Sequence, residues 1–339
     1  MGRGKPSPAH AYTMIRFNPG RLNKIATFAV LPLIGFGLII ATRSQDDAAN
    51  PPDLRQEGIL VIANLASEDL TIYDLSESKS PATLNLPGPP HEIARLGNRL
   101  YITLDRADGL VEVDPFAPGI LRVVHLPGRP HGIAIDHRGI HVTLDDANEV
   151  VTLNPVSLEV IDRQPTGDTP HIAAAHDDVL YITDTRDDRL RAIHPGGETT
   201  LRETGALPES LAIAGDRLIV GEAESGALAV FQLDGLEFEG IVKVGGWPAR
   251  LEVHGDHLIV ARSRAATLDI LHLSDFSLVS RIDLGLFPDG ICISPSGRYA
   301  GVATNDDGLL TVIDTEDWEA LGTIAGGTGP GACAWLARN

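Results

Sequence analysis

Three histidines each follow a proline at intervals of forty residues: His91, His131 and His171. Neutral imidazoles are good ligands for zinc and copper, and three of them around one ion with an open coordination position form a known catalytic arrangement. Such a site activates water or polarises a carbonyl group. The regular spacing predicts that the three side chains occupy equivalent positions of a repeated structural unit.

The prolines themselves mark a longer repeat. Seven of them recur at intervals of 38 to 42 residues: Pro90, Pro130, Pro170, Pro208, Pro248, Pro288 and Pro330. Each opens an apolar stretch, followed by a polar turn, a β-rich run, a second turn and further apolar runs. Four strands in a unit of about 40 residues are typical of a β-propeller blade.

The two ends of the repeat complement each other. Residues 57–88 supply three strands with no proline-led strand before them, and the C-terminus supplies one such strand, GACAWL. Pairing the last strand with the first sheet would complete a seventh blade and remove open sheet edges. The predicted fold is therefore all-β, a closed seven-bladed propeller of four-stranded blades spanning residues 57–339.

Several short motifs carry a resemblance to known repeat families. They are the strand openers PHGIAI and PDGICI, the second strands YITL, HVTL and YITD, and the third strands LVEVD and LTVID. Over about residues 57–339 the chain resembles the YVTN-type seven-bladed propellers, and more distantly the NHL and virginiamycin B lyase-like ones. The resemblance implies the architecture, which hosts binding proteins and enzymes alike. The lyase-like enzymes use His and Glu from later blades, where this chain has the openers WPAR, FPDG and GPGA.

In the usual propeller layout, the residue after each proline lies at the mouth of the central channel. Three of these residues are histidines, and two others are the carboxylates Glu209 and Asp289. We therefore expect His91, His131, His171, Glu209 and Asp289 as candidate ligands for a divalent metal, copper or zinc. The alternative is that duplication of the blade explains the histidines, with each imidazole bonded to a backbone carbonyl.

The loops between second and third strands should reach the same face, and six of the seven carry carboxylates. The predicted ligand-binding rim contains Asp105, Asp145, Asp184 and Glu222, together with Arg250 beside the mouth. A negative rim would concentrate cations or attract a basic partner. Asp and Asn are also common turn residues, which need no ligand to explain them.

The other histidines and the two cysteines are expected to be structural. Cys292 and Cys333 fall on adjacent inner strands but differ by one position when counted from their prolines, which predicts opposite orientations and two small buried thiols. The remaining histidines fall on outer strands or opposite-face turns and are expected at the surface: His125, His137, His141, His176, His194, His254, His257 and His272.

The N-terminal part has a different composition from the rest. Residues 1–24 are basic and contain no acid, residues 25–42 form an uncharged apolar run, and residues 43–56 read as a polar linker. This order predicts a membrane anchor or signal segment that leaves residues 57–339 outside the cytoplasm, in the periplasm or at the cell surface. The lack of a good cleavage site favours an anchor, but a start at Met14 would give an ordinary cleaved signal.

The charge of the remaining chain excludes one class of partner. Beyond residue 43 the chain has 21 basic residues against 46 acidic ones, so it should repel the phosphates of nucleic acids. No nucleophile elbow, phosphate-binding glycine loop or zinc-binding helix motif is present. Two hypotheses remain: a membrane-tethered or exported propeller that binds a protein partner or small ligand at its top face, and a metal-dependent hydrolase, lyase or oxidase that uses the three histidines.

Overall fold

The computed structural model describes residues 54–77 and 79–338. The predicted basic segment 1–24, the apolar run 25–42 and most of the linker 43–56 lie outside these residues. Within the described part of the chain, no helix is long and apolar enough to span a membrane. The helices found there are two short 3-10 turns, η1 (Asp105–Ala107) and η2 (Ser263–Ala265).

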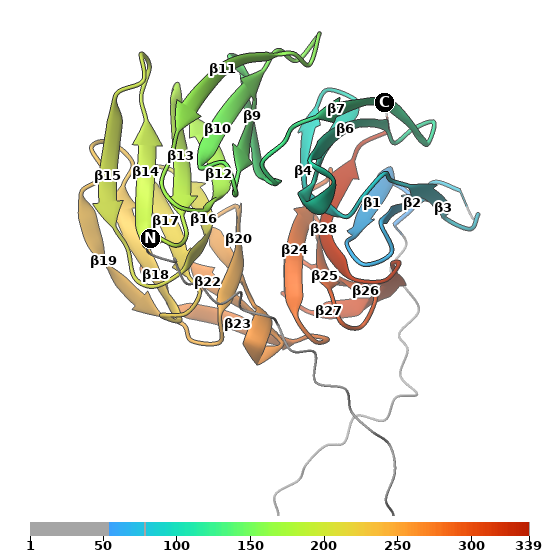
Figure 1. Cartoon of the computed structure of the whole chain (residues 1–339). Helices are drawn as coiled ribbons and strands as arrows, with labels where there is room; N and C mark the ends of the chain where they lie inside the picture. The colour runs from blue at the N-terminus through green and yellow to red at the C-terminus, as the bar shows by residue number, and fades with distance from the viewer. Residues whose placement is uncertain (1–53, 78, 339) are drawn as a thin grey trace, which may run out of the picture. The chain divides into compact units, whose positions relative to one another are not determined.

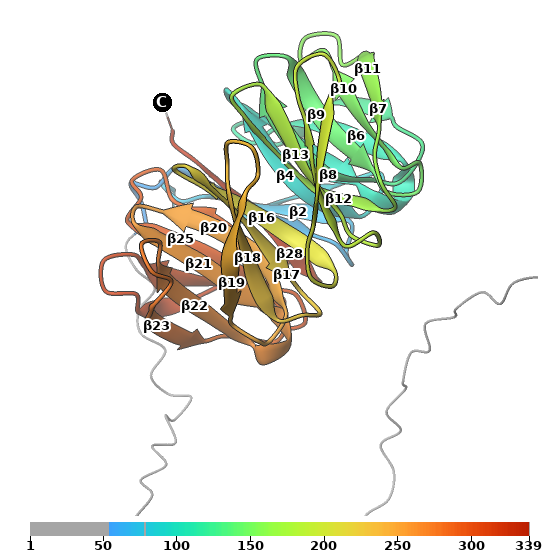
Figure 2. The same ribbon diagram turned by 90° about the vertical axis from the view of Figure 1, so that its left-hand side faces the viewer.

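The described residues form seven four-stranded antiparallel sheets, the blades of a propeller (Figures 1 and 2). Blade 1 contains β1 (Ile59–Asn64), β2 (Asp69–Asp74), β3 (Ala82–Asn85) and, from the end of the chain, β28 (Pro330–Leu336). Blade 2 contains β4 (Pro90–Leu96), β5 (Arg99–Leu104), β6 (Gly109–Asp114) and β7 (Gly119–His125). Blade 3 contains β8 (Pro130–Asp136), β9 (Gly139–Leu144), β10 (Glu149–Leu153) and β11 (Val160–Pro165).

The other four blades repeat this order of inner to outer strands. Blade 4 contains β12 (Pro170–His176), β13 (Val179–Asp184), β14 (Arg189–Ile193) and β15 (Thr199–Glu203). Blade 5 contains β16 (Pro208–Ala214), β17 (Arg217–Glu222), β18 (Ala227–Gln232) and β19 (Phe238–Lys243). Blade 6 contains β20 (Pro248–His254), β21 (His257–Arg262), β22 (Thr267–His272) and β23 (Leu278–Asp283). Blade 7 contains β24 (Pro288–Ile293), β25 (Tyr299–Thr304), β26 (Leu309–Asp314) and β27 (Ala320–Ala325).

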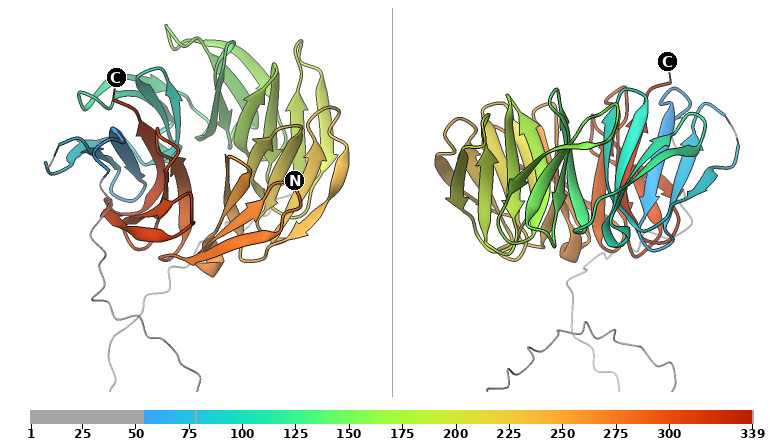
Figure 3. Two further views of the ribbon diagram at one scale, coloured as in Figure 1. Left: turned by 180° about the vertical axis from the view of Figure 1, so that it is seen from behind. Right: turned by 45° about the horizontal axis from the view of Figure 1, so that its top comes forward.

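The ring closes through blade 1, as the sequence predicts. Strand β28 pairs antiparallel with β1, from Ile59 opposite Leu336 to Asn64 opposite Pro330. The red C-terminal strand accordingly lies beside the blue first strand in Figure 3. The predicted seven-bladed, all-β architecture is therefore confirmed.

Apolar side chains between neighbouring blades form the core. The second strand of a blade is covered on both faces by the adjacent blades, which explains why β9 is buried along its whole length. Outer strands such as β7 alternate between exposed and partly buried residues, because only part of their surface is covered. Because of this packing, exposed and covered residues alternate along the outer strands, whereas the inner strands are continuous apolar runs.

A disulfide joins β24 of blade 7 to β28 of blade 1, which corrects the expectation of two free thiols. Cys292 and Cys333 are bonded, with their Cα atoms 5.6 Å apart. The one-position offset does turn the two side chains to opposite faces of equivalent strands. In neighbouring blades, however, opposite faces are the ones that meet. Cys292 and Cys333 accordingly belong to the same apolar cluster between blades 7 and 1.

Candidate functional site

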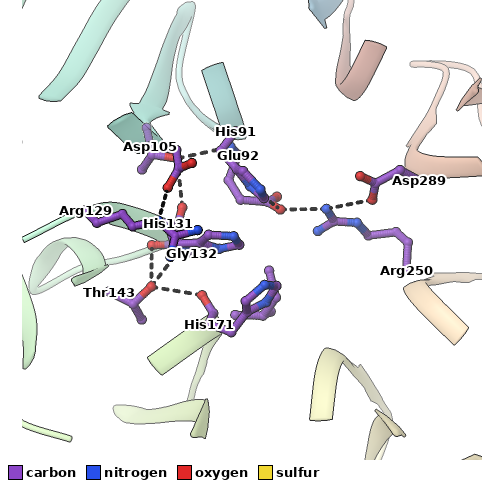
Figure 4. A network of polar contacts seen from close by, with 12 residues as sticks. His91, Glu92, Asp105, Arg129, His131, Gly132, Thr143, His171, Arg250 and Asp289 are labelled. Carbon is purple, nitrogen blue, oxygen red and sulfur yellow. Dashed lines mark hydrogen bonds and ion pairs between the residues drawn. The ribbon is translucent and has the colours of Figure 1, made fainter. Parts of the chain in front are cut away.

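Three histidine rings lie side by side at the channel mouth, tilted relative to one another (Figure 4). His91 on β4, His131 on β8 and His171 on β12 come from three successive blades. The ring centroids of His91 and His131 are 3.7 Å apart, and those of His131 and His171 are 3.8 Å apart. The outer pair, His91 and His171, is separated by 6.4 Å. The structure thus brings together the three side chains that the sequence singled out.

Bulges and threonines hold these histidines in position. Each inner strand carries one extra residue directly after its proline, so β8 pairs Pro130 with Leu144 and next pairs Ile133 with Val142. Such a bulge redirects the side chains that follow it. In Figure 4 the hydroxyl of Thr143 accepts a hydrogen bond from the Gly132 amide at 2.7 Å and donates to the His171 carbonyl at 2.9 Å.

An equivalent threonine links blade 2 to blade 3. The Thr103 hydroxyl donates to the His131 carbonyl at 2.7 Å and accepts from the Glu92 amide at 3.0 Å. The backbone is close-packed here, because a Cβ atom at Gly132 would lie only 2.2 Å from the His171 carbonyl oxygen. The backbones of His131 and His171 are therefore fixed by the preceding blades, while the rings are left facing the mouth.

One nitrogen on each ring has no hydrogen-bond partner among the described residues. The Nδ1 atoms of His91, His131 and His171 are all buried and make no hydrogen bond, although His91 Nδ1 lies 3.6 Å from Glu92 Oε1. The alternative that each imidazole is held by a backbone carbonyl is thus realised at none of the three Nδ1 atoms, but the His171 ring does interact with the backbone of Glu209. Buried polar atoms in native proteins are nearly always paired, so three adjacent unpaired nitrogens call for an explanation.

Two of the three rings are neutral at physiological pH. Burial, together with repulsion from His171, lowers the pKa of His131 far below its usual value. Burial and the charge of His91 lower the pKa of His171 to about 3. Burial also acts against protonation of His91, but its interaction with Glu92, whose Oε1 lies 3.6 Å from His91 Nδ1, outweighs burial and raises its pKa. A neutral imidazole has a free lone pair, which is the form that ligates metals.

An ion-pair network crosses the channel beside the three histidine rings. The Nη2 atom of Arg250 lies 2.6 Å from Glu92 Oε1 and 3.2 Å from Asp289 Oδ1 (Figure 4). These three residues come from blades 6, 2 and 7. Burial opposes ionisation of Glu92, but Arg250 and His91 lower its pKa to about 2. Burial raises the pKa of Asp289, with Arg250 acting in the opposite direction.

The atoms that could share one metal ion include a residue that sequence reasoning missed. His91, Glu92 and His131 each offer one ligand atom, and the three atoms lie within 4.8 Å of one another. His171 stands on the far side of His131 from His91. Asp289 is bound to Arg250, and Glu209 accepts a hydrogen bond from Trp247 Nε1 at 2.8 Å. Around a tetrahedral ion with bonds of about 2.0–2.1 Å, neighbouring ligand atoms are about 3.3 Å apart, so the three side chains would have to move closer together to bind it.

The predicted rim carboxylates lie beneath the rim instead of on it. Asp105, Asp145, Asp184 and Glu222 are all at most 5% exposed. Arg129 pairs with Asp105 at 2.5 Å and with Asp145 at 3.8 Å, and Asp184 pairs with Arg191 at 2.8 Å. Glu222 accepts a hydrogen bond from the Gly205 amide. These side chains lie at or directly after the ends of second strands and are buried, so they do not form an exposed binding rim.

Other acidic residues of the same loops do reach the surface, whereas Arg250, also predicted at the rim, is largely buried in the channel. The exposed carboxylates of these loops are Glu68, Asp146, Asp187, Asp188, Glu224, Asp306 and Asp307. The Arg250 side chain is only 16% exposed, and both of its carboxylate partners face the channel. The loops around the mouth are therefore negative, as expected, but through different residues.

One histidine expected at the surface is buried. His141 is 3% exposed, because it lies in the second strand β9 and not on an outer strand. Its Nε2 atom pairs with Asp136 at 2.9 Å, and its Nδ1 atom contacts the Thr152 hydroxyl at 2.9 Å. Both nitrogens are satisfied, so His141 is part of the packing of blade 3.

A cavity of about 200 Å³ lies in the channel and is lined by Glu92, Arg250, Ser210 and Glu252, among others. Burial raises the pKa of Glu252 to about 7, and Arg250 counteracts the shift only in part. The cavity thus contains one firmly ionised carboxylate, Glu92, and one carboxyl group poised to exchange a proton near neutral pH.

No family model matches the chain, and no curated protein sequence matches it. Solved structures show the same fold at low sequence identity. A protein of unknown function from Desulfotomaculum acetoxidans is 12% identical, with a TM-score of 0.72 over 83% of this chain and 100% of its own. A streptogramin B lyase is 14% identical, with a TM-score of 0.65 over 74% of this chain and 88% of its own. The dihydro-heme d1 dehydrogenase NirN is 12% identical, with a TM-score of 0.60 over 84% and 75%.

Proposed function

We propose that this protein is an exported, membrane-tethered propeller that binds a divalent transition-metal ion, copper or zinc, at the mouth of its channel. His91, Glu92 and His131 would supply the ligands. The observation that carries the proposal is that the Nδ1 atoms of His91 and His131 are buried without a hydrogen bond beside the ionised carboxylate of Glu92. His91 keeps 23% of its side chain exposed, which gives an ion a path from solvent.

Charge and chemistry both support a cation as the ligand. The positive charge of Arg250 would repel a metal ion, but Arg250 is already paired with the two carboxylates of Glu92 and Asp289. Exposed acids in the surrounding loops attract cations toward the mouth. Nitrogen and oxygen ligands of this type suit zinc and copper better than magnesium or calcium.

Two features support the proposed location outside the cytoplasm. The basic segment followed by the apolar run 25–42 has the order of a membrane anchor or signal. The disulfide between Cys292 and Cys333 is of a kind that persists mainly in oxidising compartments. A periplasmic or cell-surface propeller is consistent with both.

The test is metal binding by the purified full-length chain. We expect His91→Ala/His131→Ala to bind one equivalent of zinc or copper fewer per chain than the wild type, measured by elemental analysis after equilibrium dialysis. His125→Ala, on the outer strand of blade 2, serves as the matched control and should bind as the wild type does. Equal metal content in the wild type and the double variant would refute the proposal, provided circular dichroism shows both folded.

One observation favours a second candidate, a metal-dependent hydrolase, lyase or oxidase. Glu252 lines the cavity together with Glu92, and its raised pKa would let it act as a general acid or base at neutral pH. A metal at the mouth could polarise a substrate or activate water beside it. If the protein is such an enzyme, the Glu252→Gln variant should lose enzymatic turnover and still bind the metal.

The Glu252 carboxyl group also predicts a pH dependence of stability. Its pKa is about 7 in the folded chain, against roughly 4.3 when unfolded. Between these values the folded chain holds a proton that the unfolded chain has lost, so stability falls as pH rises through this window. We expect Glu252→Gln to be more stable than the wild type at pH 8 by about 1–3 kcal/mol, with little difference at pH 4.5.

Urea unfolding at the two pH values measures this effect. Glu149→Gln, which alters an exposed ion pair with Arg163, is the control and should change stability by less than about 1 kcal/mol at either pH. A Glu252→Gln variant no more stable than the wild type at pH 8 would show that Glu252 is already ionised without penalty.

A further inference from the structure

A second group of histidines lies at the opposite end of blade 6 from the mouth. Strand β20 ends at His254, β21 begins at His257, and β22 ends at His272. The mouth end of the same blade is marked by Pro248, which pairs with Arg262 at the other end of β21. The sequence suggested that these histidines are unrelated surface residues.

Strand register brings the three rings onto one face of the sheet. His254 is directly opposite His257, and His257 is directly opposite His272. Directly opposed residues of antiparallel strands project to the same side, with Cβ atoms about 4.5–5.5 Å apart. The centroids of the His257 and His272 rings are 5.1 Å apart.

A carboxylate from the adjoining turn completes a set of ligands. Asp256 Oδ1 lies 2.9 Å from His257 Nδ1. Asp256, His257 and His272 each offer one ligand atom, and these atoms all lie within 4.8 Å of one another. Asp256 is 82% exposed, so solvent reaches the group directly. Asp275, in the turn after β22, lies near enough for its charge to interact with that of His272.

Trp318 of blade 7 packs beside this group. Its ring centroid is 5.2 Å from that of His257 and 6.4 Å from that of His254. The indole is only 4% exposed, so it forms an apolar wall next to the polar group. This wall limits rotation of the His257 ring and holds it near His272.

We propose that Asp256, His257 and His272 form a second metal site, which binds a divalent transition-metal ion such as zinc, copper or nickel. Two imidazoles and one carboxylate are suitable ligands for these ions, and the remaining positions are open to water or to a donor group from a partner. The cross-strand pairing preorganises two of the three ligands. The proposal shares no residue with the mouth site and stands independently of it.

Tryptophan fluorescence of the full-length chain tests the site, because bound copper quenches a nearby indole. We expect a saturable quenching phase on titration with copper, which Trp318→Phe removes. His257→Ala/His272→Ala should raise the copper concentration at the midpoint of that phase at least tenfold. The His91→Ala/His131→Ala variant should keep the phase unchanged.

The matched control is His254→Ala, which removes a histidine of the same row that is outside the ligand set. It should retain the quenching phase with its midpoint unchanged. The proposal is overturned if the phase survives unchanged in His257→Ala/His272→Ala, or if it disappears in the mouth variant and persists in the blade 6 variant.

Discussion

Replacing Arg250 with methionine is expected to destabilise the propeller at pH 7 by about 3–5 kcal/mol, the largest effect predicted for any single substitution here. The guanidinium group bridges Glu92 and Asp289 across the channel, where its own side chain is 16% exposed. Its loss leaves two partly buried carboxylates without a counter-ion. Leaving a buried charge unpaired lowers the free energy of unfolding several times more than breaking an exposed ion pair does.

The pH dependence of this effect has a definite sign. Arg250 helps to lower the pKa of Glu92 to about 2, so Glu92 contributes stability above its unfolded pKa that is lost as pH falls toward 2. Without Arg250 the Glu92 carboxyl group should protonate at higher pH, which relieves the repulsion. The loss of unfolding free energy caused by Arg250→Met should therefore be smaller at pH 4.5 than at pH 7.

Urea unfolding at both pH values measures this loss, with Arg163→Met as the matched control. Arg163 pairs with Glu149 on an outer surface and is 49% exposed, so its replacement should cost less than about 1 kcal/mol. A similar small cost for Arg250→Met would mean that the network across the channel is solvated and contributes little.

Removing the disulfide is the second large effect. Cys292→Ser/Cys333→Ser should lower the free energy of unfolding by about 2–4 kcal/mol, because the bond restricts the unfolded chain. The bond also ties β28, the strand that closes the ring against β1, to the inner strand β24 of blade 7. Separation of β28 from blade 7 should become easier in the variant.

The wild type and the double variant should converge under reduction. A reducing agent should lower the urea midpoint of the wild type and leave that of the Cys292→Ser/Cys333→Ser variant unchanged. Two thiols that react with an alkylating reagent in the unfolded, unreduced wild type would show that the bond is absent.

The architecture could be predicted because each blade repeats a local pattern. A proline, four apolar runs and their turns recur within about 40 residues, and the leftover strands at the two ends fit into one blade. The meeting of His91, His131 and His171 follows from the same logic, since equivalent positions of successive blades adjoin at the mouth.

What escaped prediction depends on contacts between distant blades or on the direction of single side chains. Glu92 is paired with a residue 158 positions away, and no local pattern shows this. The acidic loops predict that Asp145 and its equivalents are exposed. These residues lie at the ends of second strands, however, and their side chains are buried like those of the strands. The disulfide escapes prediction because the one-position offset places the two cysteines on opposite faces of equivalent strands, and those are the faces that meet between neighbouring blades.

The most direct measurement for the central proposal is anomalous diffraction from crystals of the full-length chain or its propeller, soaked with zinc and recorded on both sides of the zinc absorption edge. We expect an anomalous peak at bonding distance from Glu92 and from ring nitrogens of His91 and His131. Well-ordered histidine rings at the mouth with no such peak, at a zinc concentration that fills other sites in the same crystal, would contradict it.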